Sequence, residues 1–303
     1  MYSVRSLESV KKQSTIIAAV VFLIPVAFFI SVFIIYPILN SFWLSVHRWN
    51  GISSAIIYTG VENWQTLLTD KIFFRAFLNN LTIVVLSILI QLPIAMALAY
   101  MLDIGGKKLN FLKTVYFLPL LMSSVAIGFL FKYTYDPQFG LISAVSEMFG
   151  GEGMVDLLGD PAKAIFSVIA VICWQFVPFY MMYFLAALSS QPVEIFEAAT
   201  IDGATRNQYF WRIALPIMKG TVKSAAILSL VGSLKYFDLI YVMTQGGPSN
   251  ATELMATYMY KNAFQMMRMG YGSTIASGMF LIVTIISLFM LNIMNKEKGG
   301  VLS

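Results

Sequence analysis

The chain has 303 residues, of which 58% are hydrophobic and only 12% charged, and its mean hydropathy is +0.77. A typical soluble domain is about 25% charged; a single soluble core could not bury this much apolar surface, so a lipid bilayer is the expected solvent. The net charge of +5 comes from basic residues scattered between apolar runs, which argues against a nucleic-acid-binding patch. His47 and Cys173 are the only residues of their types, which argues against a histidine metal site, a Ser-His-Asp triad and an intrachain disulfide.

Six apolar stretches are long enough to cross a bilayer, which takes about 20 residues per helix. In chain order they are 15–38, 79–102, 114–134, 164–188, 222–243 and 273–294. Each must be helical, because lipid cannot satisfy exposed backbone groups. The first stretch is too long for the apolar core of a signal peptide and shows no clear cleavage site. We therefore expect an all-α membrane domain over 15–294, flanked by tails 1–14 and 295–303.

The placement of lysine and arginine predicts the orientation, since cytoplasmic segments carry more of both. With the N-terminus inside, the inner segments hold eleven such residues: Arg5, Lys11, Lys12, Lys107, Lys108, Lys113, Arg206, Arg212, Lys219, Lys296 and Lys298. The longer outer segments hold six: Arg48, Lys71, Arg75, Lys163, Lys261 and Arg268. We therefore expect both termini in the cytoplasm, as an even number of spans requires.

Two outer segments, 136–160 and 251–269, are long enough to contain helices lying on the outer membrane surface. The first surrounds the apolar stretch Phe139–Phe149, and the second follows a plausible helix start at Thr252-Glu253. Simple packing explains both segments. The alternative is that these segments bind an extracytoplasmic partner.

The inner segment 189–220 predicts a short helix–turn–helix that projects into the cytoplasm. Ser190 can cap a helix whose first turn contains Pro192. Gly203 can end that helix in a left-handed conformation. A second helix is expected over about 205–214, closed by Pro216. Such a protrusion suits insertion of a helix into a groove of a partner protein.

The spacing of this segment resembles the EAA loop of permease subunits of binding-protein-dependent ABC importers. The matching residues are Glu197, Ala198, Ala199, Gly203, Ile213, Leu215 and Pro216. In that family the loop forms coupling helices that insert into a cleft of the cytoplasmic ATPase. The resemblance therefore implies a type I importer permease fold with six spans, and an ATPase-coupling role for these residues and for Asp202.

A second segment, 238–253, resembles the region after the fifth span in the carbohydrate (maltose-type) branch of this family. Its Gly246-Gly247-Pro248 sequence is typical of a sharp turn out of the membrane. Tyr36-Pro37 and 60–64 are also similar to the branch. The resemblance implies an assembly with a second, distinct permease, two ATPase subunits and an extracytoplasmic solute-binding protein. ATP and Mg²⁺ would bind the ATPase subunits, and no cofactor would bind this chain.

The candidate solute pathway follows one face of the fifth span, where polar and small residues recur at helical spacing. These residues are Ser229, Gly232, Ser233 and Tyr236. Gln175 and Phe179 share a face of the fourth span. Hydroxyls and rings suit a sugar, although small residues also line ordinary contacts between helices. Lys235 and Asp238 lie three apart near the outer edge of the membrane, where a mutual salt bridge is one interpretation and a gate or a contact with solute is the alternative.

The sequence contains no Gly-x-x-x-x-Gly-Lys-Ser/Thr loop, His-Glu-x-x-His or Gly-x-Ser-x-Gly motif. If transport is active, a separate ATPase must supply its energy. The first alternative is a permease for a non-sugar solute such as glycerol phosphate, phosphate, a polyamine or an amino acid. The second is a secondary transporter driven by an ion gradient. The third is an intramembrane enzyme, for which the sequence shows no convincing catalytic dyad.

Overall fold

The computed structural model describes residues 20–151 and 153–296 of the chain. The expected tail 1–14, residues 15–19 of the first span and residues 297–303 lie outside the described residues, as do Arg5, Lys11, Lys12 and Lys298. The described residues divide into two compact units, one within 20–68 and 262–277 and the other within 69–261 and 278–296.

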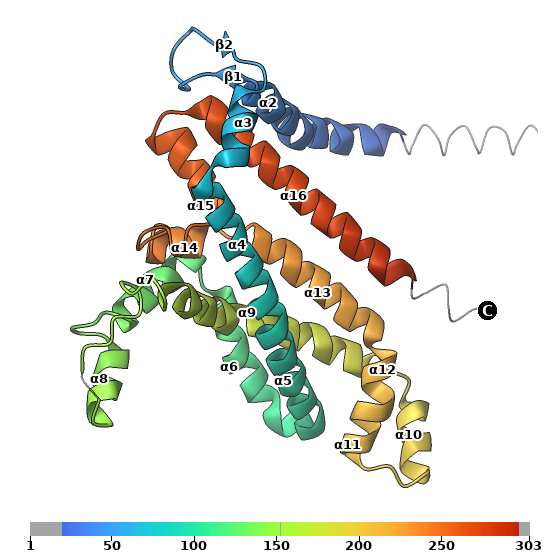
Figure 1. Ribbon diagram of the computed structural model, residues 1–303. Helices are drawn as coiled ribbons and strands as arrows, with labels where there is room; N and C mark the ends of the chain where they lie inside the picture. The colour runs from blue at the N-terminus through green and yellow to red at the C-terminus, as the bar shows by residue number, and fades with distance from the viewer. Residues whose placement is uncertain (1–19, 152, 297–303) are drawn as a thin grey trace, which may run out of the picture. The chain divides into compact units, whose positions relative to one another are not determined.

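Four of the six expected spans are continuous helices, and the third is a bent pair of helices. The fifth begins in the helix over Lys219–Leu234, which follows the helix over Arg206–Ile217 at a 67° bend. The continuous helices run over Val20–Ser45, Lys71–Gly105, Ala164–Ser189 and Met269–Asn292. The first contains η1 (Ser31–Ile35) and α2 (Tyr36–Ser45), and the second contains α4 (Lys71–Leu86), η2 (Ser87–Gln91) and α5 (Leu92–Gly105). The fourth and sixth spans are α9 (Ala164–Ser189) and α16 (Met269–Lys296) (Figure 1).

The third span is broken, which corrects the expectation of a single helix over 114–134. Helix α6 (Asn110–Leu121) follows the short η3 (Gly106–Leu109) and ends before Met122. Helix α7 (Ser124–Thr134) then begins at a bend of 95°. Ser123 caps α7, since its hydroxyl accepts a hydrogen bond from the Val125 N–H at 3.3 Å.

The fifth span is also shorter than expected. Helix α13 (Lys219–Leu234) ends before Lys235, and a separate helix α14 (Asp238–Met243) follows. Phe237 has φ −141°, which is incompatible with a continuous helix between the two. The expectation of one helix over 222–243 is therefore wrong at its C-terminal end.

The unit of residues 20–68 and 262–277 contains a small β-hairpin, so the fold is not purely helical. Strand β1 (His47–Arg48) pairs antiparallel with β2 (Ile57–Tyr58), and α3 (Glu62–Thr69) follows. The Asn63 amide donates to the carbonyls of Ser45 and His47 at 3.0 and 2.9 Å. The hydroxyl of Thr274, in the first turns of α16, donates to the Ser45 carbonyl at 3.1 Å. Hydrogen bonds thus join the hairpin region to α16.

The second unit is built around α9. Small residues on α5, including the fully buried Ala95 and Ala99, allow α5 to pack closely on α9. Its first apolar core joins α5 and α9 to Phe210, Ala214 and Met218. A second core, towards the start of α9, joins Ile83, Ile127 and Val168 to Leu239 and Leu254.

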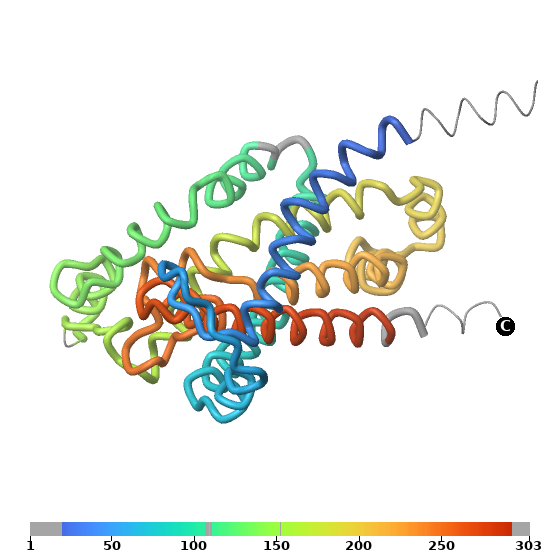
Figure 2. Tube along the Cα trace, turned by 90° about the horizontal axis from the view of Figure 1, so that it is seen from above, coloured from blue at the N-terminus to red at the C-terminus, as the bar shows by residue number. Residues whose placement is uncertain are grey.

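Polar connections lie at opposite ends of α9 (Figure 1, Figure 2). Helix α8 (Leu141–Met148) belongs to the segment before α9, and α10 (Val193–Ile201) follows its C-terminal end. A helix of 26 residues is about 39 Å long, enough to cross a bilayer. The two connections therefore suit opposite membrane surfaces.

Candidate functional site: a coupling loop and a central cavity

The segment after α9 forms two short helices joined by a tight turn. Pro192 occupies the N-cap position of the first helix, α10, and makes no side-chain capping hydrogen bond. The expected cap Ser190 lies before this position, and its hydroxyl donates to the Ala187 carbonyl at the end of α9. The second runs through α11 (Arg206–Tyr209), η4 (Phe210–Ala214) and α12 (Leu215–Ile217). Pro216 lies inside this second helix, so the expectation that it closes the helix is wrong.

Gly203 forms the turn between the two helices in the left-handed conformation, with φ +78°. Its N–H donates to the Thr200 carbonyl at 3.0 Å, and the Ala204 N–H donates to the Ala199 carbonyl at 2.9 Å. These bonds satisfy carbonyls that the end of α10 would otherwise leave unpaired. Thr205 then caps α11 through a capping box with Gln208. The sequence therefore encodes both the end of one helix and the start of the next.

Side chains clamp the two loop helices together. The Phe196 and Tyr209 rings meet edge to face at a centroid distance of 5.1 Å. The Arg206 guanidinium lies 4.5 Å from the centre of the Phe196 ring. Burial raises the pKa of the Tyr209 phenol, which donates to Gln191 Oε1 at 2.9 Å, while the Gln191 amide donates to the Ala214 carbonyl at 3.2 Å.

The loop is also attached to α5. The Tyr100 and Phe210 rings stack at 4.2 Å, and the Tyr100 hydroxyl donates to Asn207 Oδ1. Phe210 is 3% exposed and belongs to the core shared by α5 and α9. The helix pair is therefore anchored in the membrane domain. The contacts of Tyr100, Gln191 and Tyr209 were not predicted from the sequence, because their partners are distant in sequence or on another helix.

The residues expected to couple to an ATPase lie along this loop. Glu197, Ala198, Asp202, Gly203 and Pro216 are exposed, Ile213 and Leu215 are half-buried, and Ala199 is buried. Ile201 and Trp211 are also exposed, at 86% and 64%. The exposed surface of the loop thus combines small, acidic and apolar side chains.

A cavity of about 270 Å³ lies between α9, α13 and the η2 turn of the second span. Nine residues line it: Gln91, Phe176, Phe179, Tyr180, Leu228, Ser229, Gly232, Ser233 and Tyr236. The structure therefore brings together all four residues expected on the fifth span with Phe179 of the fourth. Gln91 and Tyr180 were not anticipated, although Gln91 stands out as a polar residue within an apolar run.

The cavity combines aromatic rings with polar groups. Phe176 and Tyr236 meet edge to face at 5.7 Å. Ser229 is 2% exposed, and its hydroxyl lies beside the Tyr180 side chain. Gln91 is equally buried and donates to the Ser87 hydroxyl at 3.2 Å.

Three expected pathway residues lie elsewhere. The Gln175 amide donates to the Ser124 hydroxyl of α7 at 3.2 Å, so this side chain points to the broken third span rather than to the cavity. Lys235 and Asp238 are exposed, and within the described part of the chain no ion pair joins them. Because the helix ends at Leu234, these two residues do not occupy successive turns of one helix.

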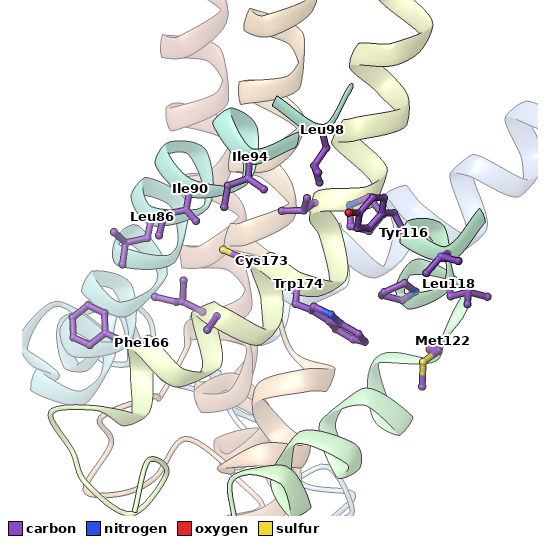
Figure 3. A pocket seen from close by; sticks show the side chains of 16 residues that line it. Leu86, Ile90, Ile94, Leu98, Tyr116, Leu118, Met122, Phe166, Cys173 and Trp174 are labelled. Atoms are coloured by element: carbon purple, nitrogen blue, oxygen red, sulfur yellow. The ribbon is translucent and has the colours of Figure 1, made fainter. Parts of the chain in front are cut away.

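A larger groove of about 830 Å³ lies between α5, α6 and α9. Its lining includes Leu86, Ile90, Ile94, Phe166 and Trp174, whose side chains surround the space in Figure 3. Almost all of its lining side chains are hydrocarbon, so it offers a polar solute few hydrogen-bonding partners. The smaller cavity on α13 is the better candidate for a solute pathway.

The loop after α14, here called the Gly-Gly-Pro loop (residues 244–254), is held by buried polar contacts. The Glu253 carboxylate is fully buried, pairs with Lys261, and accepts a hydrogen bond from the Thr257 hydroxyl at 2.6 Å. Thr252 donates to the Gly247 carbonyl at 2.7 Å. Gly246 has φ +80°, and a Cβ there would lie 2.3 Å from Glu253 Oε2. Only glycine fits that position.

Comparison with known proteins decides the family. Residues 73–297 match the model of the binding-protein-dependent transport system inner membrane component family. The chain belongs to this family. It is therefore a multi-pass protein of the prokaryotic inner membrane and a transport permease rather than a catalytic subunit.

Individual relatives agree with this assignment. The chain is 70% identical over 130 residues to a putative ABC transporter permease protein of Caldicellulosiruptor sp. strain Rt8B.4, covering 43% of this chain and 93% of the relative. It is 32% identical to the lactose transport system permease protein LacF of Rhizobium radiobacter, covering 88% of this chain and 90% of that one. A bacterial ABC transporter involved in the import of the acidic polysaccharide alginate matches with a TM-score of 0.80 at 25% identity, covering 96% of this chain and 99% of that one.

The expected fold is thereby confirmed: this is an ABC importer permease with relatives in the carbohydrate branch.

Proposed function

We propose that this chain forms half of the translocation pathway of an ATP-driven importer of sugars or oligosaccharides. The main support for the proposal is that α9 and α13 both line the cavity and both connect to the coupling loop. Helix α9 contributes Phe179 and Tyr180 to the cavity and continues into α10, while α13 contributes Ser229 and Ser233 and is preceded by α12. A displacement of the loop would therefore move both walls of the cavity.

The energy for such movement would come from a separate ATPase that holds the exposed loop surface. A partner can shift a conformational equilibrium only if it binds the two states with different affinity. The clamped and anchored helix pair suits this role, because a rigid element transmits displacement instead of absorbing it. Glu197, Ala198, Ala199, Asp202 and Gly203 would form the first part of the contact, with Ile213, Leu215 and Pro216 in the second helix.

The proposed assembly contains this chain, a second homologous but distinct permease, two ATPase subunits and an extracytoplasmic solute-binding protein. One solved relative is an alginate ABC transporter in complex with a pentasaccharide-bound periplasmic protein, which supports the last of these partners. ATP and Mg²⁺ would bind the ATPase subunits, and this chain would bind no cofactor. The coupling loop and both termini would face the cytoplasm.

A sugar is the proposed solute because the cavity combines rings with hydroxyl and amide groups. Aromatic faces accommodate the C–H faces of a pyranose, and Ser229, Ser233 and Gln91 can exchange hydrogen bonds with its hydroxyls. Relatives named for multiple sugars, trehalose/maltose and lactose support the same class. A permease for glycerol phosphate, polyamines or phosphate is the alternative, followed by a transporter driven by an ion gradient.

Reconstitution tests the function directly. The complex purified with its partner subunits would be placed in proteoliposomes with its binding protein and radiolabelled neutral oligosaccharides. We expect uptake that requires ATP inside the vesicle and is unchanged by collapsing ion gradients. Uptake that persists without an ATPase would refute the proposal, and uptake restricted to phosphates or polyamines would replace the sugar class.

Cross-linking tests the coupling contact and its orientation separately. Cys173 is the only cysteine, so a Cys173→Ala background permits single reporters. Glu197→Cys should cross-link to the ATPase and resist an impermeant thiol reagent added outside intact cells. The exposed Ser249→Cys, on the Gly-Gly-Pro loop, is the matched reporter and should react from outside. The reverse pattern would overturn the proposed orientation.

A further inference from the structure

Asn80 is a fully buried polar residue in the second membrane span, with 0% of its surface exposed. A polar side chain within a span is costly unless hydrogen bonds satisfy it. Its amide nitrogen donates to the carbonyls of Ser233 and Leu234 at 3.2 and 3.4 Å. Its amide oxygen accepts a hydrogen bond from the Met255 N–H at 3.0 Å. Both ends of the amide are therefore used.

The two carbonyls that Asn80 binds belong to the last two residues of α13. The final carbonyls of a helix have no partner within the helix. Within a membrane, no bulk water replaces that partner. Asn80 therefore stabilises the end of α13 at Leu234, where the expected single fifth span instead divides.

The end of α13 is also part of the cavity wall, since Ser233 and Tyr236 lie on either side of it. The Met255 N–H belongs to the first residue of α15 (Met255–Tyr260), directly after the Gly-Gly-Pro loop. One side chain thus connects the second span, the end of the cavity helix and the helix that follows the loop.

We propose that Asn80 is a positioning residue for the solute pathway. By holding the end of α13, it fixes Ser233 and Tyr236 opposite Phe179 and Tyr180 of α9, and so sets the shape of the cavity. Asn80 does not line the cavity, so it acts through α13 and not by touching solute. The proposal rests on the proposed function in one respect, namely that solute passes through this cavity.

Asn80→Asp is the informative substitution, because it has nearly the same shape. The carboxyl keeps an acceptor for the Met255 N–H but cannot make both donated hydrogen bonds. The protonated form has one O–H donor, and the ionised form has none and is repelled by the Ser233 and Leu234 carbonyls. Asn79→Asp is the matched control. The Asn79 amide donates to the Glu253 and Asn250 carbonyls at 2.9 and 3.4 Å, so it contacts the Gly-Gly-Pro loop but not α13.

Thiol labelling measures the position of α13 without depending on transport. In the full complex with Cys173→Ala, Ser233→Cys reports on the end of α13, and Phe179→Cys reports on the opposite wall. Loss of one or both buried hydrogen bonds should change the labelling rate at 233 by roughly tenfold in Asn80→Asp. The rate at 179 should stay the same, and Asn79→Asp should change neither rate. General loosening of the fold would instead raise both rates.

Uptake by the same variants is the second measurement. Asn80→Asp should reduce the maximal uptake rate by roughly tenfold at a normal amount of assembled complex. An unchanged labelling rate at 233, or equal changes at 233 and 179, would refute the positioning role. If Asn80→Asp does not assemble, Asn80→Ser decides by the same labelling criteria. Absence of sugar uptake by the unsubstituted complex would refute the proposed function, while the labelling result would still decide the role of Asn80.

Discussion

The turn at Gly203 offers a graded test of coupling, because its backbone conformation is known and its surroundings are empty. Gly203 has φ +78°, and a Cβ added there would meet no atom within 4 Å. A substitution at this position therefore acts through backbone preference and not through steric overlap. Alanine in the left-handed region costs about 1 kcal/mol. Asparagine visits the same region more readily and should cost less.

Proline at position 203 should be far worse. It fixes φ near −65° and removes the N–H that binds the Thr200 carbonyl. It also disfavours the backbone conformation of Asp202, the residue before it, which has φ −72° and ψ 1°. Together these effects cost about 3 kcal/mol or more. Because the turn lies at the tip of the loop, the distortion should spoil the ATPase contact while leaving the buried cores intact.

The assay is the ratio of solute transported to ATP hydrolysed in proteoliposomes. We expect normal membrane insertion for all variants, a ratio near the unsubstituted value for Gly203→Asn, a modest loss for Gly203→Ala and severe uncoupling for Gly203→Pro. Gly220→Ala is the control, since Gly220 lies in helical conformation in α13 with equally open surroundings, and alanine there gains about 1 kcal/mol. A normal ratio in Gly203→Pro would refute the reasoning, as would equal damage from asparagine and proline.

Three further substitutions test the loop clamp, the cavity and the Gly-Gly-Pro loop. Gln191→Ala removes the contacts with Tyr209 and the Ala214 carbonyl, worth about 2 kcal/mol together, and should lower the ratio of transport to ATP hydrolysis. The loss should exceed that in Gln208→Ala, which removes only the hydrogen bond that the Gln208 side chain accepts from the Thr205 N–H. Tyr236→Ala should change solute affinity or uptake rate more than it changes assembly of the complex. Tyr133→Ala is the control, because Tyr133 is 75% exposed, and it should change neither uptake kinetics nor assembly. Unchanged uptake kinetics in Tyr236→Ala would exclude this residue from the pathway. Glu253→Gln breaks a buried ion pair and should destabilise the solubilised complex by about 3 kcal/mol in thermal unfolding. Glu62→Gln, in the exposed pair with Arg48, should cost less than about 1 kcal/mol, and equal losses in the two variants would contradict the burial argument.

The membrane spans and the coupling turn were predictable from sequence because their signals are local. Hydrophobic runs identified six spans, and the left-handed Gly203 follows from a glycine placed directly after an amphipathic helix. The break in the third span also has a local signal, because a proline inside a span often marks a kink. Pro119 and the capping Ser123 lie within four residues of each other at the bend. A hydropathy pattern does not detect such a break, because both halves of the span are equally apolar.

The end of the fifth span had no local signal, because its cause is a residue far away in the chain. Leu239 and Ile240 continue the apolar run beyond Lys235, so the pattern alone predicts one helix. The partner that satisfies the carbonyls at the end of α13 is Asn80, 153 residues before Ser233. Similarly, the sequence pattern at Thr252-Glu253 predicts only a helix start, whereas the Glu253 side chain is buried beside Lys261. A sequence pattern records where a backbone needs a hydrogen-bond partner, but only the fold shows which side chain supplies it.

The two ends of α13 therefore have different physical constraints, which bears on how an importer could move it. At the loop end, α13 meets α12 at a 67° bend, and the attachment there is mainly apolar and aromatic packing. At the other end, buried hydrogen bonds from Asn80 hold its last carbonyls. Apolar contacts lack direction and permit sliding, whereas buried hydrogen bonds lose their energy when donor and acceptor separate. A push at the loop should consequently tilt α13 about the end held by Asn80, so that cavity residues nearer the loop, such as Leu228 and Ser229, move further than Ser233.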